Sequence, residues 1–359
     1  MKALVLSEYS RLEVTEVPRP ASGPGEVLVQ VAACGICGSD VHGYDGSSGR
    51  RIPPLVMGHE AAGVVAEVGE GVTAFQAGDR VTFDSTVYCG ECAFCREGLI
   101  NLCDNRQVVG VSTPDFRRAG AFAEFVTVPE RIVYKLPEGM SFAEAAMLEA
   151  VAVALHGVAV SNLKGGETAL VIGAGMIGLL TLQAAKAAGC SLVLVTDVDA
   201  SRLGLAKEAG ADTTILASGA AMVNEVLRLT SGRGVDVVLE AVGRDETVSA
   251  AVDAVRKGGT VTLIGNITPS VNLPLQKVVS RQIRMQGSCA SCGEYPQAME
   301  LIAQGKIKVT PLITAVAPLS DGAAWFERLH AREAGLMKIV LDPRLDMGLD
   351  VAKTAGVGR

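Results

Sequence analysis

One stretch of this sequence, residues 169–197, restricts the possible folds more than any other. An apolar run opens it and is followed by Gly173-Ala-Gly175-Met176-Ile177-Gly178 and a helical pattern to about residue 188. A second apolar run ends at Asp197, about 20 residues beyond the last glycine, and this arrangement is the full dinucleotide-binding fingerprint. The stretch therefore predicts a strand, a helix and a second strand of a parallel sheet, with a dinucleotide at the glycine-rich turn.

The parts of this fingerprint have separate physical roles. The glycines let the backbone approach a pyrophosphate, which binds at the positive N-terminal end of the helix. Asp197 can accept hydrogen bonds from both hydroxyls of the adenosine ribose and would repel a 2′-phosphate, so the predicted cofactor is NAD rather than NADP. Arg202 is also placed among the cofactor-binding residues, although an arginine there would favour a 2′-phosphate. The alternative is a glycine-rich turn that binds nothing.

The alternation of strand and helix continues beyond Asp197. Apolar strands are predicted at 236–240 and 260–265, with a helix between them that runs to about Arg256. Repeated units of this kind form a parallel sheet with helices on both faces. Val242 and Ile264 lie where these strands end, at the edge of the sheet where ligands bind. We expect them to contact the nicotinamide half of the cofactor, although they could equally belong to packing turns.

The first 135 or so residues have a different pattern. Short runs with alternating apolar residues, such as 26–31, 63–68 and 122–128, are separated by turns rich in proline and glycine. Such runs indicate short antiparallel strands, so this part is predicted to be mostly β and barrel-like. At 359 residues the chain exceeds what one core usually supports, which makes two domains the default.

A cluster of reactive side chains lies between residues 34 and 60. It contains a thiol, a hydroxyl, two imidazoles and a carboxylate: Cys37, Ser39, His42, His59 and Glu60. A catalytic zinc typically takes three protein ligands of the Cys, His and carboxylate types and keeps a fourth position open. We predict that Cys37, His59 and Glu60 bind zinc and that Ser39 and His42 move a proton. The chain has only four histidines and two lie here, but a chance cluster remains the alternative.

A second group consists of four cysteines at short separations. They are Cys89, Cys92, Cys95 and Cys103, with the spacing C-x2-C-x2-C-x7-C. Four thiolates can close tetrahedrally on one zinc and leave no open position, which is a structural site. The loop around them has few apolar residues, so the metal would supply much of its folding free energy. An iron–sulfur cluster or redox-active disulfides are the alternatives.

The tract 141–160 is predicted to be one apolar helix. Ser141 and Glu144 fit a capping box at its start. Glu149 has apolar neighbours on nearly every side, and burying a carboxylate without a partner is costly. We therefore expect Glu149 to face a cation or a hydrogen-bond donor, and the predicted catalytic zinc is the obvious candidate. Otherwise Glu149 points into solvent from one edge of the helix.

Composition excludes several classes of partner. A net charge of −7 and a pI near 5.3 argue against nucleic acid or an anionic membrane, since both would favour a basic surface. Aromatic residues make up only 4%, too few for base-stacking platforms. No secretory signal or membrane span is predicted, because the apolar tracts are short or interrupted by charged residues. The nine cysteines are therefore expected in a reducing cytoplasm, where metal binding or chemistry is more common than disulfides.

In combination, these motifs resemble those of the zinc-dependent medium-chain dehydrogenases. The segments occur in the order found in that family: Cys37-Gly-Ser-Asp-Val-His42, Gly58-His-Glu60, the four-cysteine lobe, Glu149 and the Gly173 fingerprint. The sequence is most similar to the sorbitol (L-iditol) dehydrogenase branch, which has Glu after the zinc-binding His and a Glu where Glu149 stands.

The resemblance implies an α/β protein with two domains. A GroES-like, mostly-β catalytic domain would be made from both chain ends, 1–150 and 286–359, and a doubly wound Rossmann NAD-binding domain, 151–285, would be inserted between them. The family also implies an active cleft between the domains and homodimers or homotetramers built through the Rossmann edge strands.

The implied activity is the NAD-dependent oxidation of a secondary alcohol, such as a polyol or sugar alcohol, to a ketone. Zinc would act as a Lewis acid on the substrate hydroxyl, and the cofactor would accept the hydride. The proton would pass through Ser39 and the nicotinamide ribose toward His42. Glu149 would orient the zinc-bound water or ligate the metal when the site rearranges.

One departure bears on the substrate. Sorbitol dehydrogenases commonly carry a Phe-Arg pair near the segment Gly287-Ser-Cys-Ala, where the Arg contacts polyol hydroxyls, and this sequence has no Arg there. L-threonine 3-dehydrogenases share most of the layout but usually have Thr where Ser39 stands. Zinc-free quinone or enone reductases lack both sets of metal ligands. A catalytically silent NAD-binding protein is the remaining alternative, and the open zinc site argues against it.

Overall fold

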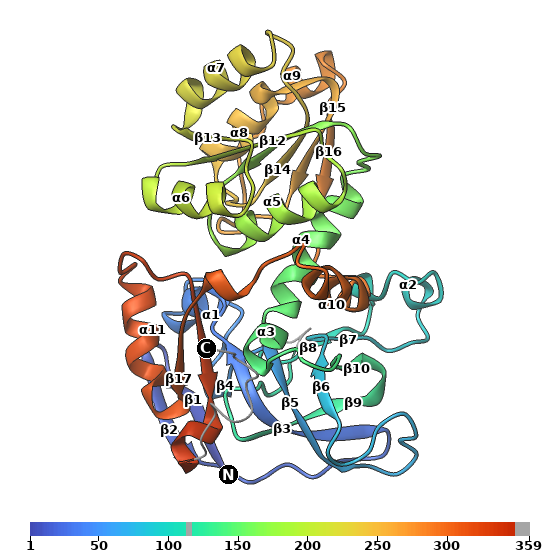
Figure 1. The fold of residues 1–359 in the computed structure, drawn as a ribbon. Coiled ribbons are helices and arrows are strands. Elements are labelled where there is room, and N and C mark those ends of the chain that lie inside the picture. Colours follow the sequence, from blue (N-terminus) through green and yellow to red (C-terminus); the bar gives the residue numbers. More distant parts are fainter. Residues whose placement is uncertain (113–116, 349–359) are drawn as a thin grey trace. The chain divides into compact units, whose positions relative to one another are not determined.

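The computed structural model describes residues 1–112 and 117–348, which belong to two compact units (Figure 1). The first unit comprises Met1–Glu149, Tyr295–Met299 and Val309–Arg359, and the second comprises Ala150–Glu294 and Glu300–Lys308. Both chain ends therefore contribute to the first unit. The domain limits inferred from the sequence, 1–150 with 286–359 and 151–285, stay a prediction. In the described part of the chain, no helix has the length and apolar character needed to cross a bilayer.

The first unit is mostly β. Its strands are β1 (Lys2–Glu8), β2 (Arg11–Glu16), β3 (Glu26–Gly35), β4 (Leu55–Val56), β5 (Glu60–Val68), β6 (Arg80–Phe83), β7 (Thr86–Val87), β8 (Gln107–Val108), β9 (Phe125–Pro129), β10 (Val133–Lys135), β17 (Ile313–Pro318) and β18 (Lys338–Asp342). Its α-helices are α1 (Gly38–Tyr44), α2 (Ala93–Arg96), α3 (Phe142–Ala146) and α11 (Gly322–His330). Short 3₁₀ turns are η1 (Ile100–Leu102), η2 (Glu130–Ile132), η3 (Thr310–Leu312), η4 (Leu319–Asp321) and η5 (Pro343–Met347).

The largest sheet of this unit joins segments that are distant in the sequence. Its strand order is β10-β6-β5-β3-β18-β17, and β9 pairs with β3. In the antiparallel register, Gly35 of β3 lies opposite both Glu60 of β5 and Val340 of β18. The residues just after β3, at the start of β5 and at the start of β18 are therefore held side by side. Beneath them lies an apolar core that includes a perpendicular contact between the rings of Phe122 and Phe326.

The second unit contains a parallel sheet of six strands. Their order is β13-β12-β11-β14-β15-β16, the doubly wound arrangement that the sequence predicts. The strands are β11 (Thr168–Ile172), β12 (Leu192–Asp197), β13 (Thr213–Leu216), β14 (Val235–Glu240), β15 (Val255–Leu263) and β16 (Arg284–Gly287). Its helices are α5 (Met176–Ala187), α6 (Ala200–Glu208), α7 (Gly219–Leu229), α8 (Asp245–Ala254) and α9 (Leu275–Ser280). Helices α4 (Leu148–Val160) and α10 (Tyr295–Ala303) begin in the first unit and end in the second. Helices α5 and α6 lie on one face of the sheet, and α7 and α8 lie on the other (Figure 1).

Two local predictions need correction. The capping box at Ser141 and Glu144 is confirmed, but the tract 141–160 forms two helices, because α3 ends at Ala146 with Met147 as its C-cap and α4 begins at Leu148. The Met147 N–H bonds to the Glu144 carbonyl, a tight turn that closes α3. The helix expected to reach about Arg256 ends at Ala254, because Val255 is already extended and pairs with Val235.

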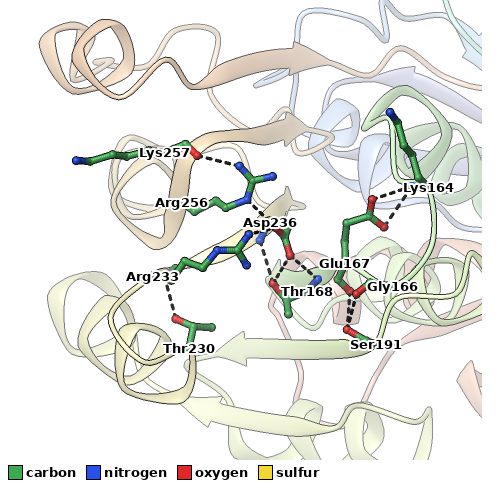
Figure 2. Close-up of polar contacts among 11 residues, drawn as sticks. Lys164, Gly166, Glu167, Thr168, Ser191, Thr230, Arg233, Asp236, Arg256 and Lys257 are labelled. Atoms are coloured by element: carbon green, nitrogen blue, oxygen red, sulfur yellow. Dashed lines mark hydrogen bonds and ion pairs between the residues drawn. The ribbon is translucent and has the colours of Figure 1, made fainter.

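A polar cluster joins the strands at the amino edge of the parallel sheet, opposite the glycine-rich turn (Figure 2). Asp236, at the start of β14, accepts hydrogen bonds from the Thr168 N–H and hydroxyl at 2.9 and 2.8 Å. It also accepts bonds from Arg233 at 2.9 Å and from Arg256 at 2.6 Å. This nearly buried carboxylate thus links the starts of β11, β14 and β15.

Candidate active site

The three predicted zinc ligands of the first unit converge in the structure. Cys37 caps the N-terminus of α1, and His59 and Glu60 lie at the start of β5. One possible ligand atom from each residue, a thiol sulfur, a ring nitrogen and a carboxylate oxygen, lies within 4.8 Å of the others. His59 and Glu60 are buried, whereas Cys37 is partly exposed. Because zinc binds such atoms at about 2.0–2.3 Å, the set fits one zinc ion with three protein ligands and an open position.

A buried lysine accompanies this ligand set. The Lys338 ammonium, at the start of β18, lies 2.5 Å from the Glu60 carboxylate and donates to the Ile36 carbonyl at 3.2 Å. Burial lowers the pKa of Lys338, but the Glu60 carboxylate and the Cys37 thiol raise it, and the result lies above the ordinary lysine value. Lys338 is therefore a buried positive charge beside two of the predicted zinc ligands, Glu60 and Cys37.

Asp40 and Arg51 form a second buried ion pair, next to His59. Asp40 Oδ1 accepts from Arg51 Nη2 at 2.8 Å and lies 3.4 Å from His59 Nδ1. Burial raises the pKa of Asp40, but His59 and Arg51 lower it well below its usual range. Burial lowers the pKa of His59, and Asp40 together with Cys37 raises it well above the ordinary value. A carboxylate at Nδ1 leaves Nε2 for a metal, the usual arrangement behind a zinc-binding histidine.

The predicted proton-transfer residues lie on the exposed face of α1. Ser39 and His42 are both exposed and are three positions apart, so they are neighbours on that face, whereas Asp40 and Gly43 are buried on an adjacent face. The Ser39 hydroxyl accepts a hydrogen bond from Arg51 Nη2 at 3.2 Å. The structure thus places Ser39 two residues from Cys37 and His42 one turn further along the helix.

Glu149 does not belong to the group of three ligand atoms within 4.8 Å. It is partly buried in the first turn of α4, where the charges of His59, Glu60, Asp84 and Lys338 act on it. Burial raises the pKa of Glu149 to about 7, Glu60 and Asp84 add to the increase, and His59 opposes it. A carboxyl group of this kind exchanges protons near neutral pH. Its direct ligation of zinc stays a prediction.

The four cysteines of the lobe 89–103 also converge. Their sulfur atoms all lie within 4.8 Å of one another, and those of Cys89 and Cys95 are 3.9 Å apart. A tetrahedral zinc with Zn–S bonds of about 2.3 Å requires sulfur atoms roughly 3.8 Å apart, so the cluster fits that ion. Backbone N–H groups of Glu91 and Cys92 point at the Cys89 sulfur and lower the pKa of Cys89 to about 6. This thiol is thereby prepared to bind metal as the thiolate.

The glycines of the predicted fingerprint are placed as a pyrophosphate cradle would require. Gly173 has φ +95°, and a Cβ there would lie 2.6 Å from Val242 Cγ2. A Cβ on Gly178 would lie 1.7 Å from the Gly173 carbonyl oxygen, so this glycine permits close packing of α5 on β11. A Cβ on Gly175 would meet nothing within 4 Å. Gly175 therefore borders open space at the N-terminus of α5, where Met176 and Ile177 begin the helix and an anion would bind.

The other predicted cofactor residues lie around this turn or at the same edge of the sheet. Asp197 ends β12, and its carboxylate accepts from the Ala174 N–H at 2.6 Å, which holds it beside the turn. Arg202 forms an ion pair with Asp199 at 3.7 Å on the surface of α6. Ile264 follows β15 and contacts α4, since a Cβ on Gly157 would lie 2.6 Å from Ile264 Cδ1.

Two family models match the chain: an alcohol dehydrogenase GroES-like domain over residues 23–138 and a zinc-binding dehydrogenase domain over residues 177–304. A sorbitol dehydrogenase of Bacillus subtilis is 34% identical over 349 residues, which cover 96% of this chain and 97% of that protein. A D-xylulose reductase A of Aspergillus niger is 34% identical over 338 residues, or 92% of this chain and 93% of that protein. This chain belongs to the zinc-dependent medium-chain dehydrogenases.

Solved structures agree with this assignment. A zinc-binding dehydrogenase from Sinorhizobium meliloti bound to NADP has a TM-score of 0.86 and 33% identity, covering 95% of this chain and 99% of that chain. The inferred resemblance is thus confirmed, and so is the fold class of a GroES-like domain with a Rossmann sheet. Because that relative is bound to NADP, membership of the family does not by itself select NAD. The choice between NAD and NADP depends on the residues of this dehydrogenase.

Sequence reasoning assigned no role to three residues of this dehydrogenase: Asp40, Arg51 and Lys338. Asp40 lies inside the quoted motif 37–42, and a carboxylate between Cys and His could have been recognised as support for a ligand. Lys338 begins a strand whose residues are all buried, so a lysine at that position was a signal for a buried partner. Arg51 lies in the loop before β4, and its sequence neighbours give no such signal.

Proposed function

We propose that this protein oxidises a secondary alcohol of a polyol or sugar alcohol to the ketone, and catalyses the reverse reaction, with zinc and NAD. The observation that carries the proposal is the convergence of Cys37, His59 and Glu60 in a chain that also contains a pyrophosphate cradle. The relatives named for sorbitol and D-xylulose support a polyol as the substrate.

Two bound groups would supply the chemistry that amino acids lack: zinc as a Lewis acid for the hydroxyl and NAD as the hydride acceptor. Cys37, His59 and Glu60 would hold the metal, with Asp40 orienting His59 and Lys338 balancing the charge of Glu60. The four-cysteine lobe would hold a second zinc with a structural role.

The chain's own residues would move the proton. Ser39 accepts the proton from the substrate hydroxyl and passes its own proton on, and His42 on the same helix face is the final acceptor. Glu149, with a pKa near 7, holds or releases a proton near the metal ligands and orients a water there. These roles follow from the positions and the chemistry of the side chains, and substitution of each residue would test its role.

The proposed cofactor is NAD because Asp197 is fixed beside the glycine turn. Its carboxylate would repel a 2′-phosphate, whereas Arg202 is engaged by Asp199. Val242, Gly173 and Ile264 border the carboxyl edge of the sheet, where the nicotinamide half would bind.

We also propose a homodimer or homotetramer, supported by β16 at the edge of the sheet and by the exposed Val279 of the adjacent α9. The cysteines that converge as predicted metal ligands support a reducing compartment, which we infer to be the cytoplasm.

The test is an NAD-reduction panel on zinc-replete protein. Sorbitol, xylitol, simple diols, sugar phosphates and L-threonine would be compared, and the proposal expects the highest kcat/KM with a polyol. Cys37→Ser should abolish turnover and leave NADH binding largely intact, as measured by NADH fluorescence. Parent-rate oxidation by that variant would refute the metal assignment, and a clear preference for threonine would refute the substrate class.

A further inference from the structure

Arg51 is a buried arginine in a loop between α1 and β4, close to the proposed zinc ligands. Only 3% of it is exposed, although arginines are almost never fully buried unless they are paired. Its Nε and Nη2 donate to Asp40 Oδ1 at 3.1 and 2.8 Å, and Nη2 also donates to Ser39 Oγ at 3.2 Å. Nη1 donates to the Arg50 carbonyl at 3.4 Å. Because it is enclosed, Arg51 acts on its neighbours and does not reach a substrate.

The backbone of α1 leaves room for this side chain at one residue. A Cβ on Gly43 would lie 2.1 Å from Arg51 Cγ and 2.8 Å from Arg51 Cβ. The stem of Arg51 therefore crosses the buried face of α1 where the helix has no side chain. The guanidinium is held from two directions, by this contact with the helix and by its bonds to Asp40 and Ser39.

The contact with Arg51 determines which hydrogen bonds Ser39 can still make. A serine hydroxyl has one proton to donate and two positions that accept. A guanidinium only donates and is always charged, so Arg51 occupies one accepting position of Ser39 permanently. Ser39 is left with one accepting position and its own proton, which is the minimum that a one-proton relay needs.

We propose that Arg51 is a positioning residue that sets the direction of proton transfer through Ser39. The inference rests on the proposed function, because that function gives Ser39 its role. As the alcohol is oxidised, its O–H proton goes to the free accepting position of Ser39, and the proton already on Ser39 leaves along the exposed face of α1 toward His42. Ser39 ends with one proton, as it began, and Arg51 keeps all of its own.

The conservative variant Arg51→Lys distinguishes the contact of Arg51 with Asp40 from its contact with Ser39. A lysine ammonium can neutralise Asp40, but it is a point charge without the fork that reaches Asp40 and Ser39 together. We expect kcat to fall by about 100-fold, the lower end of what general acid–base catalysis contributes, while KM changes little. Zinc content, NADH affinity and the absorption spectrum of the cobalt-substituted protein should stay at parent values. The matched control is Arg50→Lys, an exposed neighbour that should leave kcat unchanged.

A double-variant cycle decides whether Arg51 acts through Ser39. In a Ser39→Ala background, Arg51→Lys should cause no further loss of kcat, since the group it positions is gone. Equal losses in both backgrounds, or a loss of zinc from Arg51→Lys, would overturn the proposal and assign Arg51 to Asp40 and His59 instead.

A second variant covers the case in which Arg51→Lys does not fold. Gly43→Ala displaces the Arg51 stem without changing any charge, and it should lower kcat in the parent but not in the Ser39→Ala background. Loss of kcat in both backgrounds would overturn the proposal. The proposed function is refuted by a different result, namely that the parent protein oxidises no alcohol with NAD. The inference about Arg51 is decided by the ratio of kcat in each variant to kcat in the parent.

Discussion

The substitution Asp236→Asn tests the polar cluster at the amino edge of the parallel sheet (Figure 2). It keeps the size of the side chain and one accepting oxygen for Thr168, and it removes the negative charge that faces Arg233 and Arg256. The Asp236 side chain is only 10% exposed, so water replaces little of what is lost. We expect the second unit to be destabilised without a change of fold.

The magnitude follows from the pKa of Asp236. Burial raises that pKa, but hydrogen bonds from Thr168 and Arg256 lower it from 3.8 to about 2. A decrease of this size corresponds to about 2.5 kcal/mol of stability at pH 7, and the Asn variant should lose most of it. Because the folded-state pKa is depressed, the contribution is complete above the ordinary carboxyl pKa and is lost as the pH falls through the folded value. About 1.3 kcal/mol should remain at pH 3.

The assay is urea unfolding followed by circular dichroism, with parent and variant compared at pH 7, 5 and 3. The difference in unfolding free energy should be equal at pH 7 and 5 and about half as large at pH 3. Arg233→Ala is the control, because 59% of that side chain is exposed and its ion pair should contribute at most about 1 kcal/mol. A difference below about 0.5 kcal/mol at pH 7, or one as large at pH 3 as at pH 7, would refute the electrostatic account.

Three further predictions follow from the two ligand sites. Gly178→Ala should lower the melting temperature sharply, because its Cβ would lie 1.7 Å from a backbone oxygen. Gly175→Ala should melt like the parent but bind NADH at least about tenfold more weakly in fluorescence titrations. The opposite pattern would contradict the proposed pyrophosphate site. Asp197→Ser should raise kcat/KM for NADP relative to NAD at least about tenfold, and an unchanged ratio would show that another group selects the cofactor. Lys338→Met should lower the free energy of unfolding by about 3–5 kcal/mol in urea titrations of chelator-treated protein, because it leaves the Glu60 carboxylate buried without a counter-charge. Adding Glu60→Gln to the same chain should restore part of that free energy.

Local patterns were sufficient to predict most of the fold. The glycine spacing around Gly173 and the apolar runs that alternate with helical patterns determine backbone conformation within a few residues, so the predicted strands and helices of the second unit lie close to the expected limits. The break at Met147 and the early start of β15 at Val255 escaped prediction because they depend on a single backbone turn and on pairing with Val235.

The candidate site was predictable where its residues are adjacent in the sequence. Cys37, His59 and Glu60 stand out by residue type within a short segment, and the four cysteines of the lobe do so by spacing. The contact of Lys338 with Glu60 could not be predicted in this way, because it spans 278 residues and arises only from the register of β18 on β3. The role of Arg51 depends on the space left by Gly43, which no periodicity reveals.

The pairing of β18 with β3 also has a consequence for how the protein is made. Glu60 leaves the ribosome 278 residues before its counter-charge, which at about 5–20 residues per second is a delay of roughly 14–56 s. During that time the whole parallel sheet emerges and has every strand it needs, while the unit that began first still lacks its last strand. The second unit can therefore complete its folding before the first, and a nascent chain arrested ahead of residue 338 would hold the Glu60 carboxylate without a partner.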